Sequence, residues 1–413
     1  MDSGNIAWLM IATALVLFMT PGVAFFYGGL VKAKSVVSMM MMSFGALGLV
    51  AVLWVLIGAS MSVVESPFAF AGNPFGDFAL QNTIADDPTG EATIGIAFGA
   101  TFAIITTALI SGSIADRARF WPWMLFAGIW ATLVYFPVAA WVWGDGWISM
   151  LGEWLFPGSG LEVIDYAGGT AVHINAGAAA LALAIVLGRR VGFQKGINKP
   201  HNVPLVMLGA SILWFGWFGF NGGLVPNALG SDDNTAMGLI IVNTLVCPAA
   251  GVLGWIIIEK LKDGKSTSVG AASGAVSGLV AITPSCADIN PIWAIVLGLV
   301  AGAVCALAIE LKWKLGYDDS LDVIGVHLVG GMIGTLWLGF FANDTGLFMG
   351  GGIGQFVIQL IAAVGVMVYA FVVALVLGFA IQKIVGFRLA DEEEIAGVDA
   401  TVHGEEGYEM QVR

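Results

Sequence analysis

Residues 166–188 read YAGGTAVHINAGAAALALAIVLG, an apolar run that is long enough to cross a lipid bilayer as one helix. The run contains one histidine, His173, and no charged residue. A second apolar run, 324–342, begins IGVH and places His327 in a closely similar setting. An ionisable side chain at membrane depth is costly, so it usually faces a protein interior or a pathway. The two runs predict a helical membrane protein that moves something small and polar.

The composition of the whole chain fits this class. Of its 413 residues, 58% are hydrophobic and 11% are charged, whereas soluble domains carry about 25% charged residues. The 57 glycines suit close packing of helices in a bilayer. The long continuous apolar runs exclude the alternating pattern of a membrane barrel. The cysteines lack metal-ligand or redox spacing, so we interpret them as small hydrophobic side chains. They are Cys247, Cys286 and Cys305.

Eleven apolar segments are predicted to cross the membrane, each near or above the roughly 20 residues that a helix needs. They are residues 6–31, 36–63, 93–114, 121–143, 166–188, 203–225, 235–259, 269–286, 292–311, 324–342 and 353–385. The first segment lacks the basic start of a cleavable signal, so we expect it to remain as a span. The fold class is therefore an all-α polytopic membrane protein. Its transmembrane domain covers residues 1–388, and a tail covers residues 389–413.

The positions of the basic residues relative to the spans support this span count. All 16 Lys and Arg lie at or after the ends of odd-numbered spans, beginning with Lys32 and Lys34. The segments after even-numbered spans carry acidic residues instead: Asp77, Asp86, Asp87, Glu91, Asp145, Glu153, Glu162, Asp232 and Asp233. Basic loops of membrane proteins stay in the cytoplasm. We therefore expect a multi-pass protein of the cell membrane, with its N-terminus outside and its C-terminus inside.

Two stretches of the chain repeat each other. Residues 26–31 read FYGGLV and residues 220–225 read FNGGLV, at the ends of the first and sixth spans. The fifth and tenth spans carry the two Val-His pairs. Residues 6–188 and 203–342 are therefore predicted to be two copies of one unit. Five spans is an odd number, so the second copy enters from the opposite face, as in many transporters whose site lies at the repeat interface.

The repeat predicts where the histidines meet. Asp165 lies eight residues before His173, or about 12 Å along a helix, near the outer face. Asp322 lies five residues before His327, or about 8 Å, near the inner face. Because the two helices enter from opposite faces, the histidines are expected to meet near the middle. The alternative is a pair of unrelated structural histidines, each bonded to a backbone carbonyl.

Several motifs in this order resemble those of the ammonium transporter family (Amt/Mep/Rh), in its Amt branch. They are DYAGGTAVHIN at 165–175, TPGVAFFYGG at 20–29, GWFGFN at 216–221, KPHN at 199–202 and DVIGVH at 322–327. The resemblance runs from about residue 6 to the end of the chain. It implies a homotrimer with one narrow pore in each subunit, and ammonium or ammonia as the substrate. It also implies eleven helices, which agrees with the span count.

The resemblance assigns roles to single aromatic residues. Trp143 corresponds to the aromatic side chain that helps to bind the cation at the outer mouth. Phe102 corresponds to the outer ring of a phenylalanine gate, and Phe98 to the aromatic residue one turn away. Phe220 corresponds to the inner gate ring, and Trp217 lies beside it.

His173 and His327 correspond to the twin histidines of the family's pore, and Asp165 to the buried acid behind the outer site. Asp165 can also serve simply as a helix cap, and both roles can hold. One position departs from the family pattern. Leu224 stands where the family commonly has a serine that offers its hydroxyl to the cation. The outer site is therefore expected to bind more weakly or to rely wholly on aromatic rings.

These residues suit one mechanism. Desolvated ring faces stabilise a cation by roughly 1–2 kcal/mol each, and a dry pore then excludes the bare cation but admits neutral ammonia. Paired imidazoles offer ammonia a donor and an acceptor, and they can relay the released proton. We expect ammonium to be recruited outside and split near Phe102. The alternatives are a passive ammonia channel and an ammonium sensor of the same fold; HExxH and GxSxG enzyme motifs are absent from the sequence.

The tail at 389–413 is acidic. The simple interpretation is a solvated segment. However, Glu392, Glu393 and Glu394, followed by His403, Gly404 and Glu405, resemble the family's ordered regulatory tail. That resemblance implies coupling between subunits and regulation by a PII-type nitrogen-signalling protein. No cofactor, metal or nucleic acid is expected.

Overall fold

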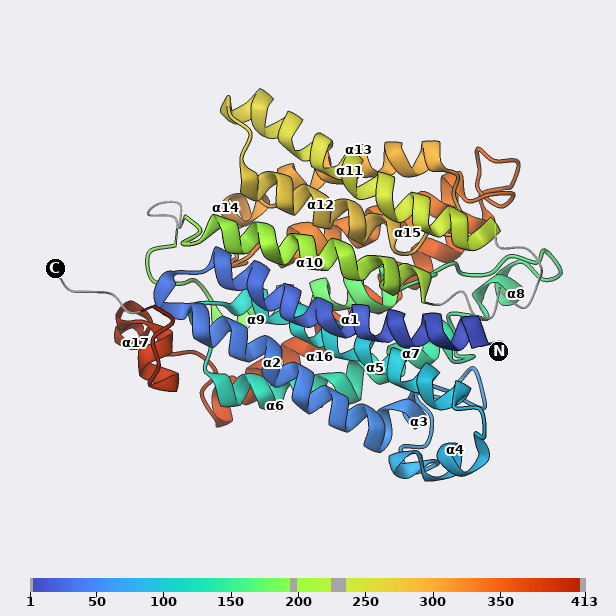
Figure 1. Ribbon diagram of the computed structural model, residues 1–413, viewed down its shortest axis with the longest axis horizontal. Helices are drawn as coiled ribbons and strands as arrows, with labels where there is room; N and C mark the ends of the chain where they lie inside the picture. Colours follow the sequence, from blue (N-terminus) through green and yellow to red (C-terminus); the bar gives the residue numbers. More distant parts are fainter. Residues whose placement is uncertain (1–2, 194–198, 224–234, 409–413) are drawn as a thin grey trace.

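The computed structural model describes residues 3–193, 199–223 and 235–408, and this part of the chain contains helices and no named β-strand. The all-α class predicted from the sequence is therefore confirmed for the described residues. The long helices run side by side along one axis and form a bundle (Figure 1).

The α-helices are α1 (Ser3–Leu30), α2 (Val36–Leu53), α3 (Ala59–Met61), α4 (Gln81–Asp86), α5 (Glu91–Ile110), α6 (Phe120–Trp130), α7 (Phe136–Trp143), α8 (Leu151–Leu155), α9 (Asn175–Leu187), α10 (Val203–Gly222), α11 (Thr235–Asp263), α12 (Ser268–Ile282), α13 (Pro291–Ala308), α14 (Leu311–Leu315), α15 (Val329–Phe341), α16 (Gly354–Ile384) and α17 (Asp391–Ala396). The described residues also form π-helical turns: η2 (Trp54–Gly58), η5 (Ala131–Tyr135), η6 (Gly169–Ile174), η8 (Ile324–Leu328) and η9 (Asp399–His403). Short 3₁₀ turns form η1 (Ala33–Ser35), η3 (Phe78–Leu80) and η4 (Ser111–Ile114).

Ten helices among the described residues are long and apolar enough to cross a membrane. They coincide with ten of the eleven predicted spans to within a few residues at most ends. The remaining predicted span, 269–286, corresponds to α12, which is apolar but has only 15 residues. The protein is thus a multi-pass helical membrane protein, and the count of eleven spans stays a prediction.

The first spans of the two predicted repeats, α1 and α10, lie side by side (Figure 1). Glycine permits their close approach. A Cβ atom on Gly209 would lie 2.6 Å from the Cα atom of Phe26, and one on Gly29 would lie 2.7 Å from the backbone nitrogen of Val206. Small residues at a helix interface let backbones approach closely in a bilayer. This pair brings the two repeat regions together along the middle of the bundle.

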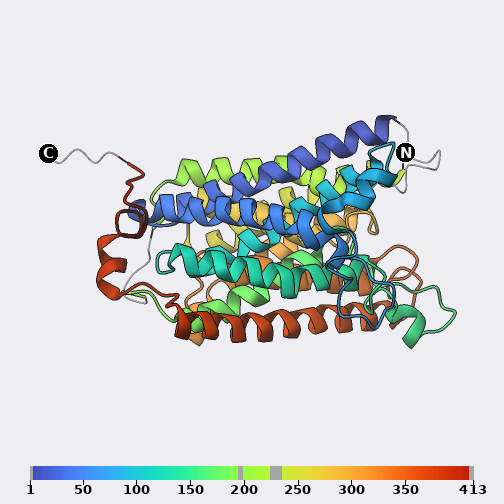
Figure 2. The ribbon, with the colours of Figure 1, turned by 90° about the horizontal axis from the view of Figure 1, so that it is seen from below.

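The start of α1 and the tail helix α17 lie at opposite ends of the bundle (Figures 1 and 2). This arrangement agrees with an odd number of crossings, whereas the sidedness of the two ends stays a prediction. The helix α16 runs along one edge of the bundle over most of its length, as Figure 2 shows. It packs against α9, the helix that continues from His173.

A buried ionic cluster fixes the end of the bundle that faces the tail. The Arg190 guanidinium lies between two carboxylates, 2.8 Å from Asp318 and 3.1 Å from Asp116. Next to it, Arg117 donates to the Ser320 hydroxyl and to the Asp318 carbonyl, at 2.6 and 2.7 Å. These residues follow α5 and α9 and precede η8. The cluster therefore joins the segments that carry the two histidines at one end.

Candidate functional site

The two intramembrane histidines face each other in the interior. Nδ1 of His173 lies 3.2 Å from Nδ1 of His327, and the rings are nearly parallel, with centroids 5.3 Å apart and planes at 25°. The side chains are almost fully buried, with 1% and 4% of their surface exposed. The prediction that they meet inside the protein is confirmed, and the alternative of two unrelated histidines bonded to backbone carbonyls is wrong.

Each histidine lies on a π-helical turn that opens an apolar helix: His173 on η6 and His327 on η8. Such turns insert one residue relative to an α-helix and are frequent at functional sites. Gly168, with a positive φ of 110°, precedes η6 and provides the sharp turn that starts the helix. Both histidines therefore sit in the first turns of their helices, at equivalent places.

An aspartate caps each of these turns. The Asp165 carboxylate accepts four backbone N–H bonds, at 2.5–3.0 Å, from the residues at positions 168–171. At the other histidine the equivalent cap is Asp319, which accepts from the N–H groups of Val323 and Ile324 at 3.2 and 2.7 Å. Asp319 lies eight residues before His327, as Asp165 does before His173.

The sequence analysis named Asp322 as the acidic residue near this end of the span and did not identify Asp319 as the cap. The Asp322 carboxylate accepts from Lys312 Nζ at 2.5 Å, and Asp322 adopts the left-handed conformation at a turn, with φ of 64°. The signal that could have identified Asp319 is the identical eight-residue spacing in the two halves.

Aromatic rings continue from the histidines toward the end of the bundle that holds the start of α1 (Figure 1). Following the predicted orientation, we call this the outer end and the end that holds the tail the inner end. The Phe220 ring lies 6.2 Å from His173 and stacks on Phe102, with centroids 4.2 Å apart and planes at 26°. Trp143 follows, with its ring 6.2 Å from Phe102 and nearly perpendicular to it. Phe98 packs against Phe102 at 4.9 Å. These four of the five predicted aromatic residues thus belong to one column with the histidine pair, and Trp217 stacks on His173 itself.

Trp143 closes the outer end of this column. Its side chain is 40% exposed, and its indole N–H donates to the backbone carbonyl of Asp165 at 2.8 Å. The same aspartate therefore holds the start of η6 through its carboxylate and the outer aromatic ring through its carbonyl. Leu224, the remaining predicted residue of the outer site, lies outside the described residues.

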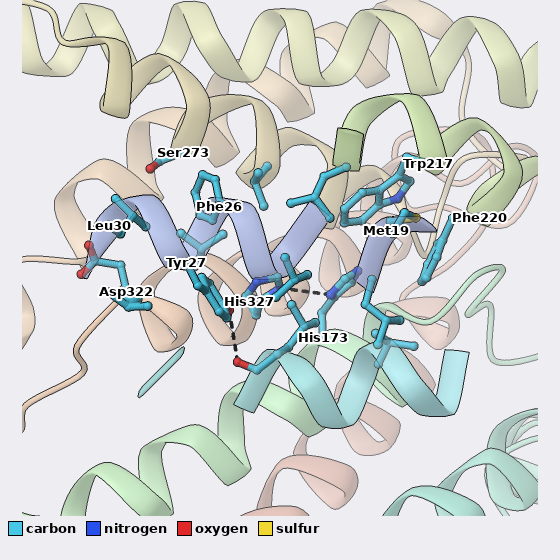
Figure 3. A pocket seen from close by; sticks show the side chains of 18 of the residues that line it. Met19, Phe26, Tyr27, Leu30, His173, Trp217, Phe220, Ser273, Asp322 and His327 are labelled. Atoms are coloured by element: carbon cyan, nitrogen blue, oxygen red, sulfur yellow. Dashed lines mark hydrogen bonds between the residues drawn. The ribbon is translucent and has the colours of Figure 1, made fainter. Parts of the chain in front are cut away.

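A narrow cavity of about 40 Å³ runs along the histidine pair on the inner side of the stacked phenylalanines. Figure 3 shows Trp217 and Phe220 at one end of this cavity, the histidines in the middle, and Leu30 and Asp322 at the other end. A water molecule needs about 10–15 Å³ by this measure, so the space holds only a few molecules of that size. Trp217 stacks on His173 at 5.5 Å and donates its indole N–H to Thr283.

The sequence analysis did not identify several residues that line this cavity, and Tyr27 is one of them. Tyr27, from the repeated FYGGLV string, lines the cavity, and its hydroxyl donates to the Leu109 carbonyl at 3.1 Å (Figure 3). Its partner in the other repeat is Asn221, which bonds Thr244 instead. Among the described residues no group of three or more His, Cys, Asp or Glu side chains is placed to hold a metal ion.

The acidic tail is folded onto the inner end of the bundle over its described part. The Glu394 carboxylate accepts from Arg388 and from the Val191 backbone N–H, at 3.0 and 2.7 Å. Glu393 accepts from the Ala390 N–H and forms an ion pair with Arg119. These bonds lower the pKa of Glu393.

The later part of the tail docks in the same way. Asp399 caps the start of α2 through the N–H groups of Val37 and Ser38, at 3.0 and 2.7 Å. The His403 ring packs edge-on against Phe120, with centroids 5.4 Å apart. Gly404 has a positive φ of 66°, and Glu392 and Glu405 are exposed. The expectation of a freely solvated tail is therefore wrong for residues 391–403.

The fold and the site together define a helical membrane protein with a narrow, largely apolar cavity beside two facing histidines. Comparison with known proteins gives the family. The Ammonium Transporter Family matches residues 7–408, and the chain belongs to this family.

Full-length relatives support this family assignment. The ammonium transporter of Mycobacterium tuberculosis is 48% identical over 442 aligned positions, which cover 100% of this chain and 91% of the relative. Ammonium transporter Amt1 of Archaeoglobus fulgidus is 39% identical over 99% of this chain and 100% of its own. Among solved structures, a sensor Amt protein superposes with a TM-score of 0.87 at 27% identity, covering 97% of this chain and 98% of that chain. Mep2 of Candida albicans gives 0.84 at 30% identity, covering 95% and 88%.

Proposed function

We propose that this protein takes up ammonium through the column that runs from Trp143 to His327. The single observation that carries the proposal is the continuity of this column. An exposed aromatic ring leads to two stacked phenylalanines and then to a buried histidine pair beside a narrow cavity. The names of the full-length relatives support ammonium as the substrate.

Recruitment takes place at the outer aromatic residues. Ring faces of Trp143 and Phe102 attract a desolvated cation by roughly 1–2 kcal/mol each. Asp165 adds negative charge behind Trp143, and among the described residues no Lys or Arg forms an ion pair with it. A neutral solute gains nothing from this charge, so the outer site selects a cation. Phe98 extends the aromatic wall beside Phe102.

The stacked rings of Phe102 and Phe220 form the gate. At 4.2 Å between centroids they leave no space between them for a hydrated ion. Passage requires the rings to move and the ion to lose its water. Burying an unpaired charge in the dry cavity beyond costs far more than burying neutral ammonia. Ammonium therefore gives up its proton at the gate, and ammonia enters the cavity.

The histidine pair is suited to ammonia. Because the two Nδ1 atoms share one hydrogen bond, one Nδ1 carries the proton and the other accepts it. The remaining Nε2 atoms then have opposite roles, one as an acceptor and one as a donor. Nε2 of His173 is buried and has no hydrogen-bond partner among the described residues. Ammonia, which both donates and accepts, can bond in turn to both histidines, and the released proton can pass along the same pair.

The test is current measured on purified protein in proteoliposomes after an ammonium pulse. A saturable inward-positive current supports electrogenic uptake. In His173→Ala we expect the current to be lost while ammonia still crosses, which internal alkalinisation detects. An unchanged current in this variant would overturn the proton relay. Alkalinisation without current in the native protein would instead identify a passive ammonia channel.

A second candidate is an ammonium sensor that binds without much flux. The observation that favours it is the superposition on a sensor Amt protein over nearly the whole of both chains. The same experiment separates the two functions. Neither current nor alkalinisation, with ammonium binding still measurable by calorimetry, would favour the sensor.

We further propose the oligomeric state and the membrane orientation that membership of this family implies. The protein forms a homotrimer in the cell membrane, with its N-terminus outside and its C-terminus in the cytoplasm. Residues 6–188 and 203–342 form an inverted repeat, which the equivalent aspartate caps at Asp165 and Asp319 support. Helix 353–385 lies outside the repeat.

The docked tail is proposed to regulate transport and to contact a PII-type protein. Glu393 and Glu394 attach it to the inner end of the bundle, whereas the exposed Glu392 and Glu405 remain available to a partner. Truncation after residue 388 is expected to reduce the ammonium current or to abolish its response to a PII-type protein. Transport and regulation that both survive truncation would contradict this role.

A further inference from the structure

Helix α16 carries two glutamines, Gln355 and Gln359, that have no role in the mechanism above. They lie about one turn apart near the outer end of the helix, so they share one face, and both side chains are fully buried. A buried amide in a membrane span is costly unless it is hydrogen-bonded, and such side chains commonly join one segment of a membrane protein to another. The partners of these two amides therefore show what α16 holds in place.

Gln359 binds both backbone groups of one residue. The Ile164 N–H donates to Oε1 of Gln359 at 2.8 Å, and Nε2 of Gln359 donates to the Ile164 carbonyl at 2.7 Å. Two residues of an antiparallel sheet exchange the same pair of bonds, and here a side-chain amide makes them. Residues 160–165 form no helix, and neither group of Ile164 has a backbone partner among the described residues. The position of Ile164 therefore depends on Gln359.

Gln355 binds the same segment and orients Gln359. Its Nε2 donates to the Glu162 carbonyl at 2.9 Å and to Oε1 of Gln359 at 3.3 Å. Because an amide nitrogen can only donate, the atom of Gln359 that faces both Gln355 and the Ile164 N–H must be its oxygen. The two side chains thus act as one unit, which we name the glutamine clamp.

The clamp also reaches the second histidine-bearing segment. Nε2 of Gln359 donates to the Thr335 carbonyl at 3.2 Å, and Thr335 lies on α15, the helix that continues from His327. The Thr335 hydroxyl lies 3.5 Å from that of Thr170, on the π-helical turn that carries His173. Gln359 therefore connects the outer parts of both segments to α16.

The residue after Ile164 is Asp165, which holds the outer aromatic ring. The Ile164 carbonyl and the Asp165 nitrogen belong to one rigid peptide plane. The Ile164 carbonyl faces Gln359, whereas the Asp165 carbonyl accepts the Trp143 indole N–H at 2.8 Å. A displacement of Ile164 therefore moves the carbonyl that holds the Trp143 ring.

We propose that Gln359, oriented by Gln355, is a positioning residue for cation recruitment at the outer site. This inference rests on the proposed function, and it gives α16, which lies outside the repeat, a part in recruitment. Gln359 lines neither the cavity beside the histidines nor the one beside Trp143, so it acts through the backbone next to Asp165. Without the clamp the Trp143 ring loses its fixed place and ammonium binds more weakly, while the histidine pair stays in place.

The test measures the half-saturating ammonium concentration and the maximal current in proteoliposomes, both per folded protein. Gln359→Met keeps the size of the side chain and removes its hydrogen bonds. We expect a half-saturating concentration about tenfold higher, which corresponds to the loss of one good cation–π contact, and a maximal current close to the native one. An unchanged half-saturating concentration in Gln359→Met would overturn the proposal.

The matched control is Gln382→Met, at the inner end of the same helix. Oε1 of Gln382 likewise accepts two backbone N–H bonds, from Phe387 and Arg388 at 2.8 and 2.9 Å. A merely structural glutamine on α16 should lower the thermal unfolding midpoint and leave the half-saturating concentration at its native value. We expect this result for Gln382→Met. An equal rise of the half-saturating concentration in both variants would contradict a specific role of Gln359.

A double-mutant cycle tests whether Gln359 acts through Trp143. Trp143→Phe retains an aromatic ring and removes the N–H that the Asp165 carbonyl holds. In this background Gln359→Met should raise the half-saturating concentration by less than about twofold, because the bond through which it acts is already absent. A full tenfold rise in this background would exclude the route through Trp143.

Gln355→Met is the second variant, and it keeps the proposal testable if Gln359→Met does not fold. It leaves the two bonds between Gln359 and Ile164 and removes the bond that orients them. We expect a half-saturating concentration about threefold higher, half of the full effect on a logarithmic scale. A native value in Gln355→Met would overturn the role of the clamp.

Calorimetric titration of ammonium into the purified variants separates this inference from the proposed function. Weaker binding in Gln359→Met, but not in Gln382→Met, would support the clamp even if the native protein carried no current. A native current together with an unchanged dissociation constant in Gln359→Met would overturn the clamp alone. Neither binding nor current in the native protein would overturn both.

Discussion

The two histidine-bearing segments begin alike and are capped with different strength. In both, an aspartate eight residues before the histidine accepts backbone N–H bonds from a π-helical turn. Asp165 accepts four such bonds, none longer than 3.0 Å. Asp319 accepts two, at 3.2 and 2.7 Å.

The surroundings of the two aspartates differ in charge as well. At the inner segment, Lys312 donates to the Asp319 carbonyl at 3.1 Å and forms an ion pair with Asp322. At the outer segment, no Lys or Arg of the described residues is paired with Asp165. Lys312 therefore offsets part of the negative charge of Asp319 and Asp322, whereas no Lys or Arg of the described residues does the same for Asp165. This difference supports the proposal that the Asp165 end of the column is the recruiting end.

The largest effect is expected from Asp165→Ala. This change leaves four buried N–H groups without an acceptor, and each orphaned donor costs about 1–3 kcal/mol. It also removes the negative charge behind Trp143. We expect a markedly lower yield of folded protein in detergent and no ammonium current from the protein that remains. Thermal unfolding and proteoliposome currents on the same preparation measure both results.

Asp165→Asn separates the cap from the charge. The amide oxygen of the asparagine can still accept N–H bonds, whereas its NH₂ group cannot. The thermal stability should therefore lie between that of Asp165→Ala and that of the native protein. The current should stay low if the charge itself recruits the cation. Full current in Asp165→Asn would show that Asp165 acts only as a helix cap.

A smaller effect is expected from Asp319→Ala. Two N–H groups lose their acceptor instead of four. At the same cost of about 1–3 kcal/mol for each orphaned donor, the loss should be about half of that in Asp165→Ala. The thermal unfolding midpoint in the same detergent should fall by less than it does in Asp165→Ala. If Asp319→Ala destabilised the protein as much as Asp165→Ala, the contrast between the two ends would be lost.

The sequence predicted the all-α bundle well because membrane spans follow from long apolar runs. The spans Glu91–Ile114, Gly169–Leu187 and Gly354–Ile384 begin and end within three residues of their predicted bounds. It also predicted that the two histidines meet, since the repeat and the parity of the spans determine their relative direction. The sequence did not identify Asp319 as the residue that caps η8, because three acidic residues lie close together at 318–322. Only the turn geometry decides which of them is the cap.

The places of Trp54 and Tyr135, which line one cavity with Phe102 and Trp143, could not have been predicted either. Trp54 and Tyr135 belong to no motif that the sequence analysis used, and the chain contains 15 Trp, 25 Phe and 6 Tyr. Their position depends on two π-helical turns, η2 and η5, which rotate each side chain relative to a regular helix. Apolar periodicity does not reveal such turns, because the segments around them are hydrophobic on every face.

The smallest effect is expected from Leu224→Ser, which sharpens the account of the recruiting end. If the outer site relies on aromatic rings and the charge of Asp165, a hydroxyl restored at position 224 adds one acceptor for the cation. A hydrogen bond of this kind contributes about 1 kcal/mol, which corresponds to a roughly fivefold lower half-saturating ammonium concentration. Leu224→Ala controls for the loss of side-chain volume and should not gain this affinity. If Leu224→Ser and Leu224→Ala had the same half-saturating ammonium concentration, the hydroxyl would add no affinity to that which the aromatic rings and Asp165 provide.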